Sequence, residues 1–319
     1  MRSSARGSDW KCAVVALGMM AAPAASAAQE AWYPSRHGPA DTLGALNNLG
    51  PADALRAARL VRTGKAYPLG VPTGPQSPAY GERRYSVQIS PAPGSPVAPV
   101  GANKVTAHDE RVTTSMGIGT QLDGLGHLGI DHRYYNGLSG AALNTPEGFK
   151  SLELSNLPPI VTRGVLIDMA RHFKTPMLQA GQAFNRAEIE AAMREQGVTV
   201  GKGDVVLFHT GWMSIMESDK ARYASSEPGI GEEGARWLAE LGVVAIGADT
   251  LALEPLPSVD ADRPFVVHQM LLAKNGVYIL ENINTAPLVR DGVKEFMFVL
   301  GAPRFVGTVQ VVVNPVAIR

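Results

Sequence analysis

The chain has 319 residues, of which 45% are hydrophobic and 18% are charged, and its 29 basic residues balance its 29 acidic residues. This composition excludes a disordered chain, a collagen-like repeat and a miniprotein held together by disulfides. A neutral chain lacks the strongly basic face that nucleic-acid binding needs, so a small-molecule substrate is the expected partner, and the low charge content favours a homo-oligomer.

The N-terminal segment has the pattern of a secretory signal. Three basic residues precede an apolar run over residues 12–22, and a stretch of small residues ends at Ala27. We therefore expect cleavage after residue 27 and a periplasmic or secreted protein. The apolar run is shorter than the roughly 20 residues of a membrane span, so no membrane association is expected. Cys12 is the only cysteine, so the mature chain would hold no thiol nucleophile, thiolate metal site or disulfide.

Residues 28–319 are expected to form a single domain. Residues 74–100 contain six prolines, a density that resists both helices and central strands. We predict a long surface loop or lid for this segment, because too few residues precede it to build a separate core.

The later part of the chain alternates between strands and helices. Helices are predicted over 187–196, with Asn185 as N-cap, and over 232–241, and each is followed by a glycine. Strands are predicted over 164–167, 204–208, 243–246 and 277–280. Apolar strands separated by helices indicate an α/β architecture, in which functional sites usually lie at strand ends.

The densest polar cluster runs from Gly119 to His127. Gln121 and Asp123 point the same way if this stretch is extended, and His127 could close over them. Residues 124–129 match G-x-G-x-x-G, but the following residues resemble a loop instead of the helix that a dinucleotide site needs. Neither a G-x-S-x-G elbow nor a P-loop occurs in the sequence.

Residues 117–127 resemble, without a gap, the hallmark H-x-G-T-H-x-D-x-P-x-H of the cyclase-like metal-dependent hydrolases, a family that includes bacterial kynurenine formamidase and isatin hydrolase. Gly119, Thr120, Asp123 and His127 match it, whereas Gly117, Gln121 and Leu125 do not. A branch carrying G-T-Q, with a Tyr-Asn-Gly nearby as at residues 135–137, is more similar. Further stretches that resemble the family occur in the family's order, one before this motif at 41–47 and the others after it at 163–168, 203–206, 210–212, 247–250 and 279–282.

The resemblance implies a swivelling β/β/α domain, usually assembled as a dimer or tetramer. It also implies one divalent metal ion, Zn or Mn, with Asp123, His268 and Glu281 as ligands and Gln121 as a further carbonyl ligand or a backbone clamp. An oxygen-rich set suits Mn²⁺ better than a soft Zn²⁺ site.

His127 is the expected general base and acid, acting on a water that the metal acidifies. Trp212, His209 and Tyr135 are candidates for substrate binding, although Trp212 could equally be a packing residue and a structural role at the strand end is favoured for His209.

The expected function is that of a metal-dependent hydrolase that opens an amide, imide or lactone acyl bond. The departures at Gly117 and Gln121 leave open a catalytically degenerate periplasmic binding protein on the same fold. A metal enzyme that catalyses dehydration or isomerisation is a third possibility, because a fold does not define a reaction.

Overall fold

The structure is a computed structural model of the 319-residue chain. It describes residues 32–92, 94 and 97–319, so the predicted signal at 1–27 lies outside the described residues. Residues Trp32–Arg319 form one compact unit. Among the helices of this unit, none has both the length and the apolar character needed to cross a membrane.

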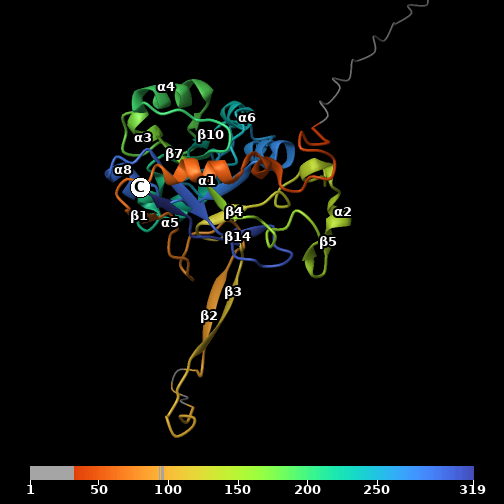
Figure 1. The fold of residues 1–319 in the computed structure, drawn as a ribbon, viewed down its shortest axis with the longest axis vertical. Helices are drawn as coiled ribbons and strands as arrows, with labels where there is room; N and C mark the ends of the chain where they lie inside the picture. Colours follow the sequence, from red (N-terminus) through yellow and green to blue (C-terminus); the bar gives the residue numbers. More distant parts are fainter. Residues whose placement is uncertain (1–31, 93, 95–96) are drawn as a thin grey trace, which may run out of the picture. The chain divides into compact units, whose positions relative to one another are not determined.

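A mixed nine-stranded sheet forms the centre of this unit (Figure 1). Its four consecutive strands β7, β9, β11 and β12 run parallel, and the other neighbouring strands pair antiparallel. Parallel strands need cover on both faces, which explains why every residue of β11 is buried. In spatial order the strands are β1 (Ala66–Pro68), β15 (Val316–Ile318), β13 (Glu295–Leu300), β7 (Ile160–Asp168), β9 (Val205–His209), β11 (Ala245–Ala248), β12 (Tyr278–Glu281), β4 (Gln121–Asp123) and β14 (Gln310–Val312).

Helices cover this sheet. Helix α1 packs on β7 and β13, and α4 packs on β7 and on α6. The α-helices are α1 (Pro51–Ala58), α2 (Gly140–Leu143), α3 (Met169–His172), α4 (Arg186–Gln196), α5 (Lys220–Ser225), α6 (Glu232–Glu240), α7 (Val266–His268) and α8 (Ala286–Arg290). Short 3₁₀ turns lie at η1 (Gly44–Asn48), η2 (Tyr135–Gly137) and η3 (Trp212–Ile215), and η4 (Gln269–Asn275) is a π-helix that continues α7.

The predicted helices and strands are confirmed, with ends that differ by one to four residues. Helix α4 follows Asn185, whose backbone N–H donates to Glu188 at 2.9 Å and whose side-chain oxygen accepts from Gly234 of α6 at 3.1 Å. Gly197 ends α4 in the left-handed conformation, with φ 68°. The cap therefore both starts α4 and attaches it to α6.

The prediction of a loop over residues 74–100 is wrong for part of that segment. Strand β2 (Tyr85–Ser90) pairs antiparallel with β3 (Asp109–Thr114) to form a two-stranded ribbon. Figure 1 shows this ribbon extending away from the nine-stranded sheet. The six prolines all lie outside β2, so the alternating stretch between them remains free to pair. Two further two-stranded sheets join β5 (Asn144–Thr145) to β6 (Gly148–Phe149) and β8 (Ala183–Phe184) to β10 (Gly229–Ile230).

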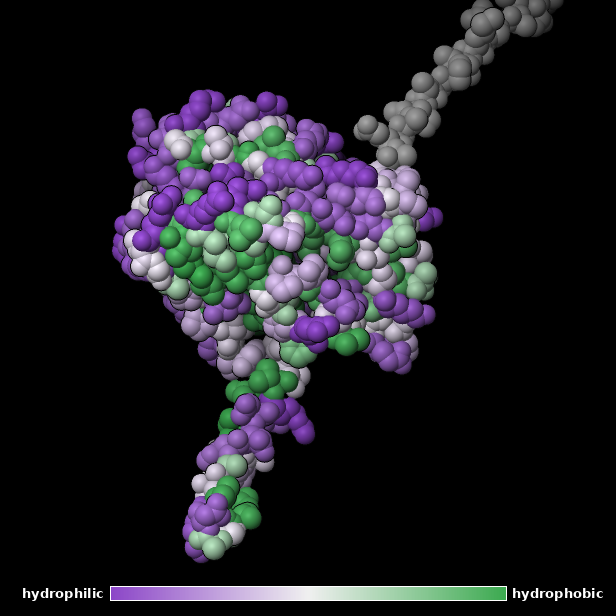
Figure 2. All heavy atoms as spheres, in the orientation of Figure 1, coloured by the Kyte–Doolittle hydropathy of each residue, from purple (hydrophilic) through white to green (hydrophobic). Residues whose placement is uncertain are grey.

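The ribbon has one apolar face. Val87 lies directly opposite Val112, and Ile89 lies two residues further on the same side. These three side chains are 44%, 48% and 46% exposed. Figure 2 shows apolar atoms along the ribbon, so within a single chain this face stays in contact with solvent.

Candidate metal centre

Polar side chains from three neighbouring strands meet on one face of the sheet. Gln121 and Asp123 are two residues apart on β4, so they share a face. Glu281 of β12 lies opposite Gln121, and Gln310 of β14 lies opposite Asp123. Directly opposite residues point to the same side, so strand register brings all four together. The predicted alignment of Gln121 with Asp123 is confirmed.

His268 completes the cluster from α7. Its Nε2 lies 3.3 Å from Glu281 Oε1 and 3.7 Å from Asp123 Oδ2. All three residues are buried, and one donor atom from each lies within 4.8 Å of the others. The structure thus brings all four predicted metal ligands together, because Gln121 bonds to both carboxylates of this cluster.

Glu254, which the sequence analysis missed, fixes the orientation of His268. Its Oε1 lies 2.6 Å from His268 Nδ1 and accepts the His268 backbone N–H at 3.0 Å, while Oε2 accepts the Val267 N–H at 3.2 Å. A carboxylate at Nδ1 favours the tautomer with the proton on that nitrogen. The lone pair on Nε2 then faces Asp123 and Glu281, as it does in carboxylate–histidine–metal arrangements.

Two amides orient the carboxylates. Gln310 Nε2 donates to Asp123 Oδ1 at 2.8 Å, and Gln121 Nε2 donates to the same oxygen at 3.3 Å and to Glu281 Oε2. Asp123 Oδ2 and Gln121 Oε1 are buried without a hydrogen-bond partner in the part of the chain that the structure describes. In this arrangement the Gln121 amide serves as a clamp, and a ligand role for its oxygen stays a prediction.

The two carboxylates that face His268 differ in acidity. Burial raises the pKa of Asp123, but the charges of His127 and His268 and the hydrogen bond from Gln310 outweigh it and lower that pKa to about 2. Burial and the neighbouring Asp123 charge raise the pKa of Glu281 to about 7. Burial alone would lower the pKa of His268, yet its carboxylate neighbours raise it well above the usual value. A buried cluster so rich in carboxylates therefore requires a cation, either a proton or a metal ion.

These donors fit a divalent ion. A tetrahedral zinc ion with ligands at about 2.0–2.2 Å holds them roughly 3.3–3.6 Å apart. The distances of 3.3 and 3.7 Å from His268 Nε2 are close to this spacing. The unpartnered Asp123 Oδ2 gives a further reason, because a buried carboxylate oxygen without a donor is costly and a cation would satisfy it.

His127 lies at the mouth of this cluster. It follows β4 through a turn in which its N–H donates to Gly124 O at 2.9 Å, and its Nε2 lies 3.9 Å from Asp123 Oδ2. Burial, and to a smaller extent the charges of His268 and Arg83, lower the pKa of His127 against the opposing effect of Asp123. The imidazole is thus neutral near pH 7 and can accept a proton.

A cavity of about 200 Å³ opens beside His127 and the cluster. Tyr80 and Phe265 meet edge to face in its wall, with ring centres 5.8 Å apart. It is lined by Tyr80, Arg83, His127, Leu128, Leu251, Ala252, Phe265, His268 and Glu281. Most of this lining is apolar, with the histidines, Arg83 and Glu281 as its charged or titratable groups.

The structure places the three predicted substrate-binding residues away from this cavity. Trp212 is fully buried in a cluster with Tyr223 and Leu251, so it packs against the wall instead of forming it. The Tyr135 hydroxyl donates to Asp41 Oδ2 at 2.7 Å. Aromatic residues pack and bind equally well, so their type gave no signal for either role.

His209 is held by its own partners. Its Nδ1 lies 2.8 Å from Thr285 Oγ1 and 3.2 Å from Asp249 Oδ2. Burial lowers the pKa of His209, but the bond to Asp249 outweighs this effect and raises the pKa. Asp249 also accepts from the Thr210 and Gly211 N–H groups at 2.8 and 2.9 Å. His209 and Asp249 therefore link the ends of the parallel strands β9 and β11.

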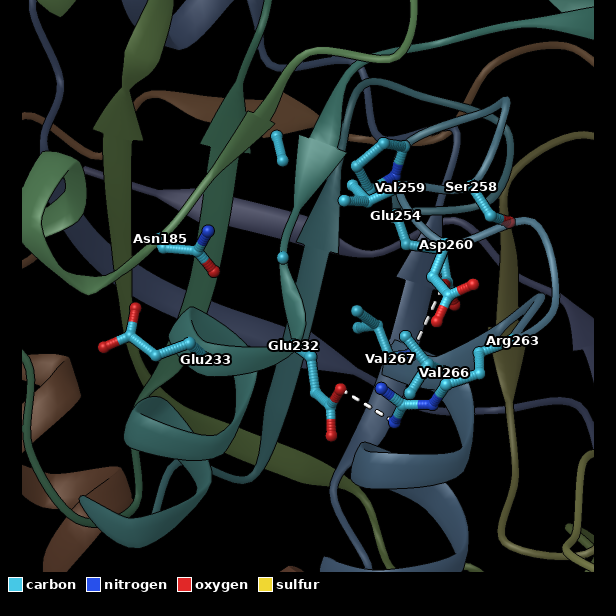
Figure 3. Close-up of a pocket in the computed structure, with 13 residues that line it drawn as sticks. Asn185, Glu232, Glu233, Glu254, Ser258, Val259, Asp260, Arg263, Val266 and Val267 are labelled. Atoms are coloured by element: carbon cyan, nitrogen blue, oxygen red, sulfur yellow. Dashed lines mark hydrogen bonds and ion pairs between the residues drawn. The ribbon is translucent and has the colours of Figure 1, made fainter.

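A second cavity, of about 240 Å³, lies beside Glu254 (Figure 3). Its charged groups already have partners: Arg263 pairs with Glu232 at 2.9 Å, and Glu254 bonds to His268. The cluster around Asp123 is therefore the better candidate for chemistry.

Comparison with known proteins gives a family and a fold. The family model described as "Putative cyclase" matches residues 67–255. A solved structure described as a novel cyclase is 27% identical, covers 89% of this chain and 96% of its own, and superposes with a TM-score of 0.80. A search of curated proteins found no match.

Two more distant structures are hydrolases. An isatin hydrolase bound to the product analogue thioisatinate is 14% identical, covers 84% of this chain and 98% of its own, and has a TM-score of 0.60. Isatin hydrolase A from Ralstonia solanacearum is 19% identical, covers 84% and 95%, and has a TM-score of 0.58. The expected cyclase-like α/β fold is thereby confirmed.

Proposed function

The chain belongs to the cyclase family, and from that premise we propose that it is a metal-dependent hydrolase which opens an amide, imide or lactone acyl bond with water. The observation that carries this proposal is the buried Asp123, His268 and Glu281 cluster, with an unpartnered carboxylate oxygen facing the histidine. The likeness of the fold to isatin hydrolases supports hydrolysis as the reaction class.

Asp123 Oδ2, His268 Nε2 and Glu281 Oε1 are the proposed ligand atoms for one divalent ion, zinc or manganese. Such an ion, when bound, acts as a Lewis acid that polarises a carbonyl and makes water more acidic. Glu254 keeps the proton on His268 Nδ1, and the amides of Gln121 and Gln310 hold the oxygens of the carboxylates that face away from His268.

His127 is the proposed proton carrier. Its lowered pKa keeps the Nε2 lone pair free near neutral pH, so it can take a proton from the attacking water. The protonated imidazole would then deliver that proton to the leaving nitrogen or oxygen. The neighbouring Asp123 carboxylate, 3.9 Å away, stabilises the imidazolium between these two transfers.

The substrate is proposed to be small. The cavity of about 200 Å³ is smaller than the roughly 300–1,000 Å³ of typical ligand pockets, and its aromatic and aliphatic walls suit a flat apolar body. Export to the periplasm and assembly as a homo-oligomer are further proposals that rest on the sequence pattern.

Elemental analysis of the purified chain tests the metal site. We expect close to one zinc or manganese ion per chain in the wild type and its loss in Asp123→Asn. Asp131→Asn is the matched control, because Asp131 is an exposed aspartate in the segment that follows β4. Its metal content should equal that of the wild type.

Hydrolysis of formyl-amides, imides and lactones tests the reaction. We expect turnover that stops with a chelator and returns with Mn²⁺ or Zn²⁺. Ligand binding that ignores the chelator, without any turnover, would instead favour the degenerate binding protein.

A further inference from the structure

Arg83 is a cation in the wall of the cavity that lacks an anionic partner. It precedes β2 at the base of the ribbon and is partly buried. Its Nη1 donates to Gly117 O at 2.7 Å. Among the described residues, no carboxylate oxygen lies within 4.0 Å of its guanidinium, whereas the next residue, Arg84, pairs with Glu82 at 2.9 Å.

Gly117 makes room for this guanidinium. A Cβ atom built on Gly117 would lie 2.7 Å from Arg83 Cζ and 2.9 Å from Gln310 Nε2. Both distances are shorter than van der Waals contact, so any side chain at position 117 would displace the two groups. The departure of residue 117 from the hallmark motif thus has a physical reason: nitrogen donors from Arg83 and Gln310 fill the space that a side chain would take.

Arg83 lines the same cavity as His127 and Glu281. The other cavity walls near it are apolar, including Tyr80, Phe265 and Leu128. A guanidinium has five N–H donors in a planar fork that matches a carboxylate, and only one bond from Arg83 to the protein is found in the described residues.

We propose that Arg83 is the anion-binding residue of this cavity and that it takes a carboxylate attached to a flat apolar body. This inference deepens the proposed function and rests on it for the origin of the carboxylate. Adding water across an acyl C–N or C–O bond breaks that bond and yields a carboxylate and an amine or alcohol. The carboxylate at Arg83 is therefore either a substituent of the substrate or the acid that hydrolysis releases.

Calorimetric titration with benzoate and with benzamide tests the proposal without turnover. These two probes have nearly the same shape and differ in charge. The full chain, treated with a chelator so that benzamide is not hydrolysed, should bind benzoate about tenfold more tightly than benzamide, as expected for a charge-assisted bidentate pair. Arg83→Gln should lose this preference. Arg84→Gln is the matched control and should keep it.

Gly117→Ala is a second variant that leaves Arg83 in the sequence. Its Cβ should push the guanidinium aside and reduce the preference for benzoate. It would also press on Gln310 Nε2, which bonds to Asp123, so this comparison uses the chelator-treated chain. Equal benzoate affinity in Arg83→Gln and wild type would overturn the proposal, as would an equal loss in Arg84→Gln. A wild type without metal or turnover would overturn the hydrolase instead, since the chelated titration reports on Arg83 alone.

Two benzanilides that differ only in a carboxylate on the aniline ring separate the two sources, because hydrolysis of both releases benzoate. If the substrate carries the carboxylate, Arg83→Gln should raise KM about tenfold for the carboxylated compound and leave the other unchanged. If the released acid binds at Arg83, the variant should weaken product inhibition equally with both compounds. No change in either quantity would contradict the assignment of Arg83.

Discussion

Glu254→Gln is the substitution that best tests how the candidate metal centre is held. The glutamate bonds to His268 Nδ1 at 2.6 Å and accepts two backbone N–H bonds at 3.0 and 3.2 Å. Glutamine has the same shape but only one acceptor oxygen and no charge. If that oxygen stays with His268, the amide NH₂ faces the Val267 N–H, and this buried donor loses its partner.

Two effects should follow. A buried N–H without an acceptor lowers the free energy of unfolding of the metal-free protein by about 1–3 kcal/mol. Loss of the carboxylate behind a metal-binding histidine weakens metal affinity by about 10- to 100-fold. That loss corresponds to roughly 1.4–2.8 kcal/mol of binding free energy.

Urea unfolding of the chelated protein measures the first effect, and calorimetric titration with Mn²⁺ or Zn²⁺ measures the second. Glu153→Gln is the control, because Glu153 accepts the Ser155 and Gly307 N–H groups at 2.8 and 3.2 Å but does not line the cavity. It should lose stability and keep its metal affinity. Metal affinity in Glu254→Gln that equals the wild type, or falls no further than in the control, would refute the role given to Glu254.

Three further predictions concern stability and assembly. Because the pKa of His209 is raised, its bond to the buried Asp249 stabilises the fold fully below pH 6.5, and this stabilisation is lost as the pH rises through the folded-state pKa. The difference in unfolding free energy between wild type and His209→Asn should therefore shrink from pH 6 to pH 9, and a constant difference would contradict this prediction. Gly197→Ala should lower the free energy of unfolding in urea by about 1 kcal/mol, because residue 197 has a φ of 68°. Gly201→Ala is equally free of contacts but lacks a positive φ, so it should keep the wild-type stability; equal losses would contradict the conformational explanation. Light scattering should give a mass above the 33.7 kDa of one chain, and a monomeric wild type would contradict the expected homo-oligomer. Val87→Lys on the apolar face of the ribbon should lower the measured mass, whereas Gln88→Lys on the polar face should leave it unchanged.

Local patterns predicted the four parallel strands of the central sheet and the helices α4 and α6, whereas the antiparallel strands β1, β13, β14 and β15 were missed. Apolar runs such as 204–208 and 243–246 are long enough to be buried strands, and Asn185 and Gly197 mark the ends of α4 in both sequence and structure. The ribbon was missed because proline density dominated the interpretation of residues 74–100. Two-residue alternation in Tyr85–Ser90 was the signal that could have identified it.

Residue type and the family resemblance predicted Asp123, His268 and Glu281; strand register explains why the two carboxylates meet, and α7 adds the histidine. The structure supplied Glu254 and Arg83, which neither motif nor spacing indicates. Glu254 lies 14 positions before His268, and Arg83 lies 34 positions before Gly117. Contacts over such separations depend on loop paths, which local propensity does not encode.

Sequence patterns alone predicted four strands with two intervening helices, the chemistry of the motif around Asp123, and the kinds of donor available to a metal. These are properties of neighbouring residues, and short-range periodicity and side-chain chemistry express them directly. Three-dimensional packing was needed to show that Gln121 turns its amide nitrogen toward both carboxylates, that Trp212 packs behind the cavity, and that Arg83 fills the space beside Gly117. Each of these outcomes depends on how side chains from distant segments share one buried volume, and that competition is settled only when the whole chain packs.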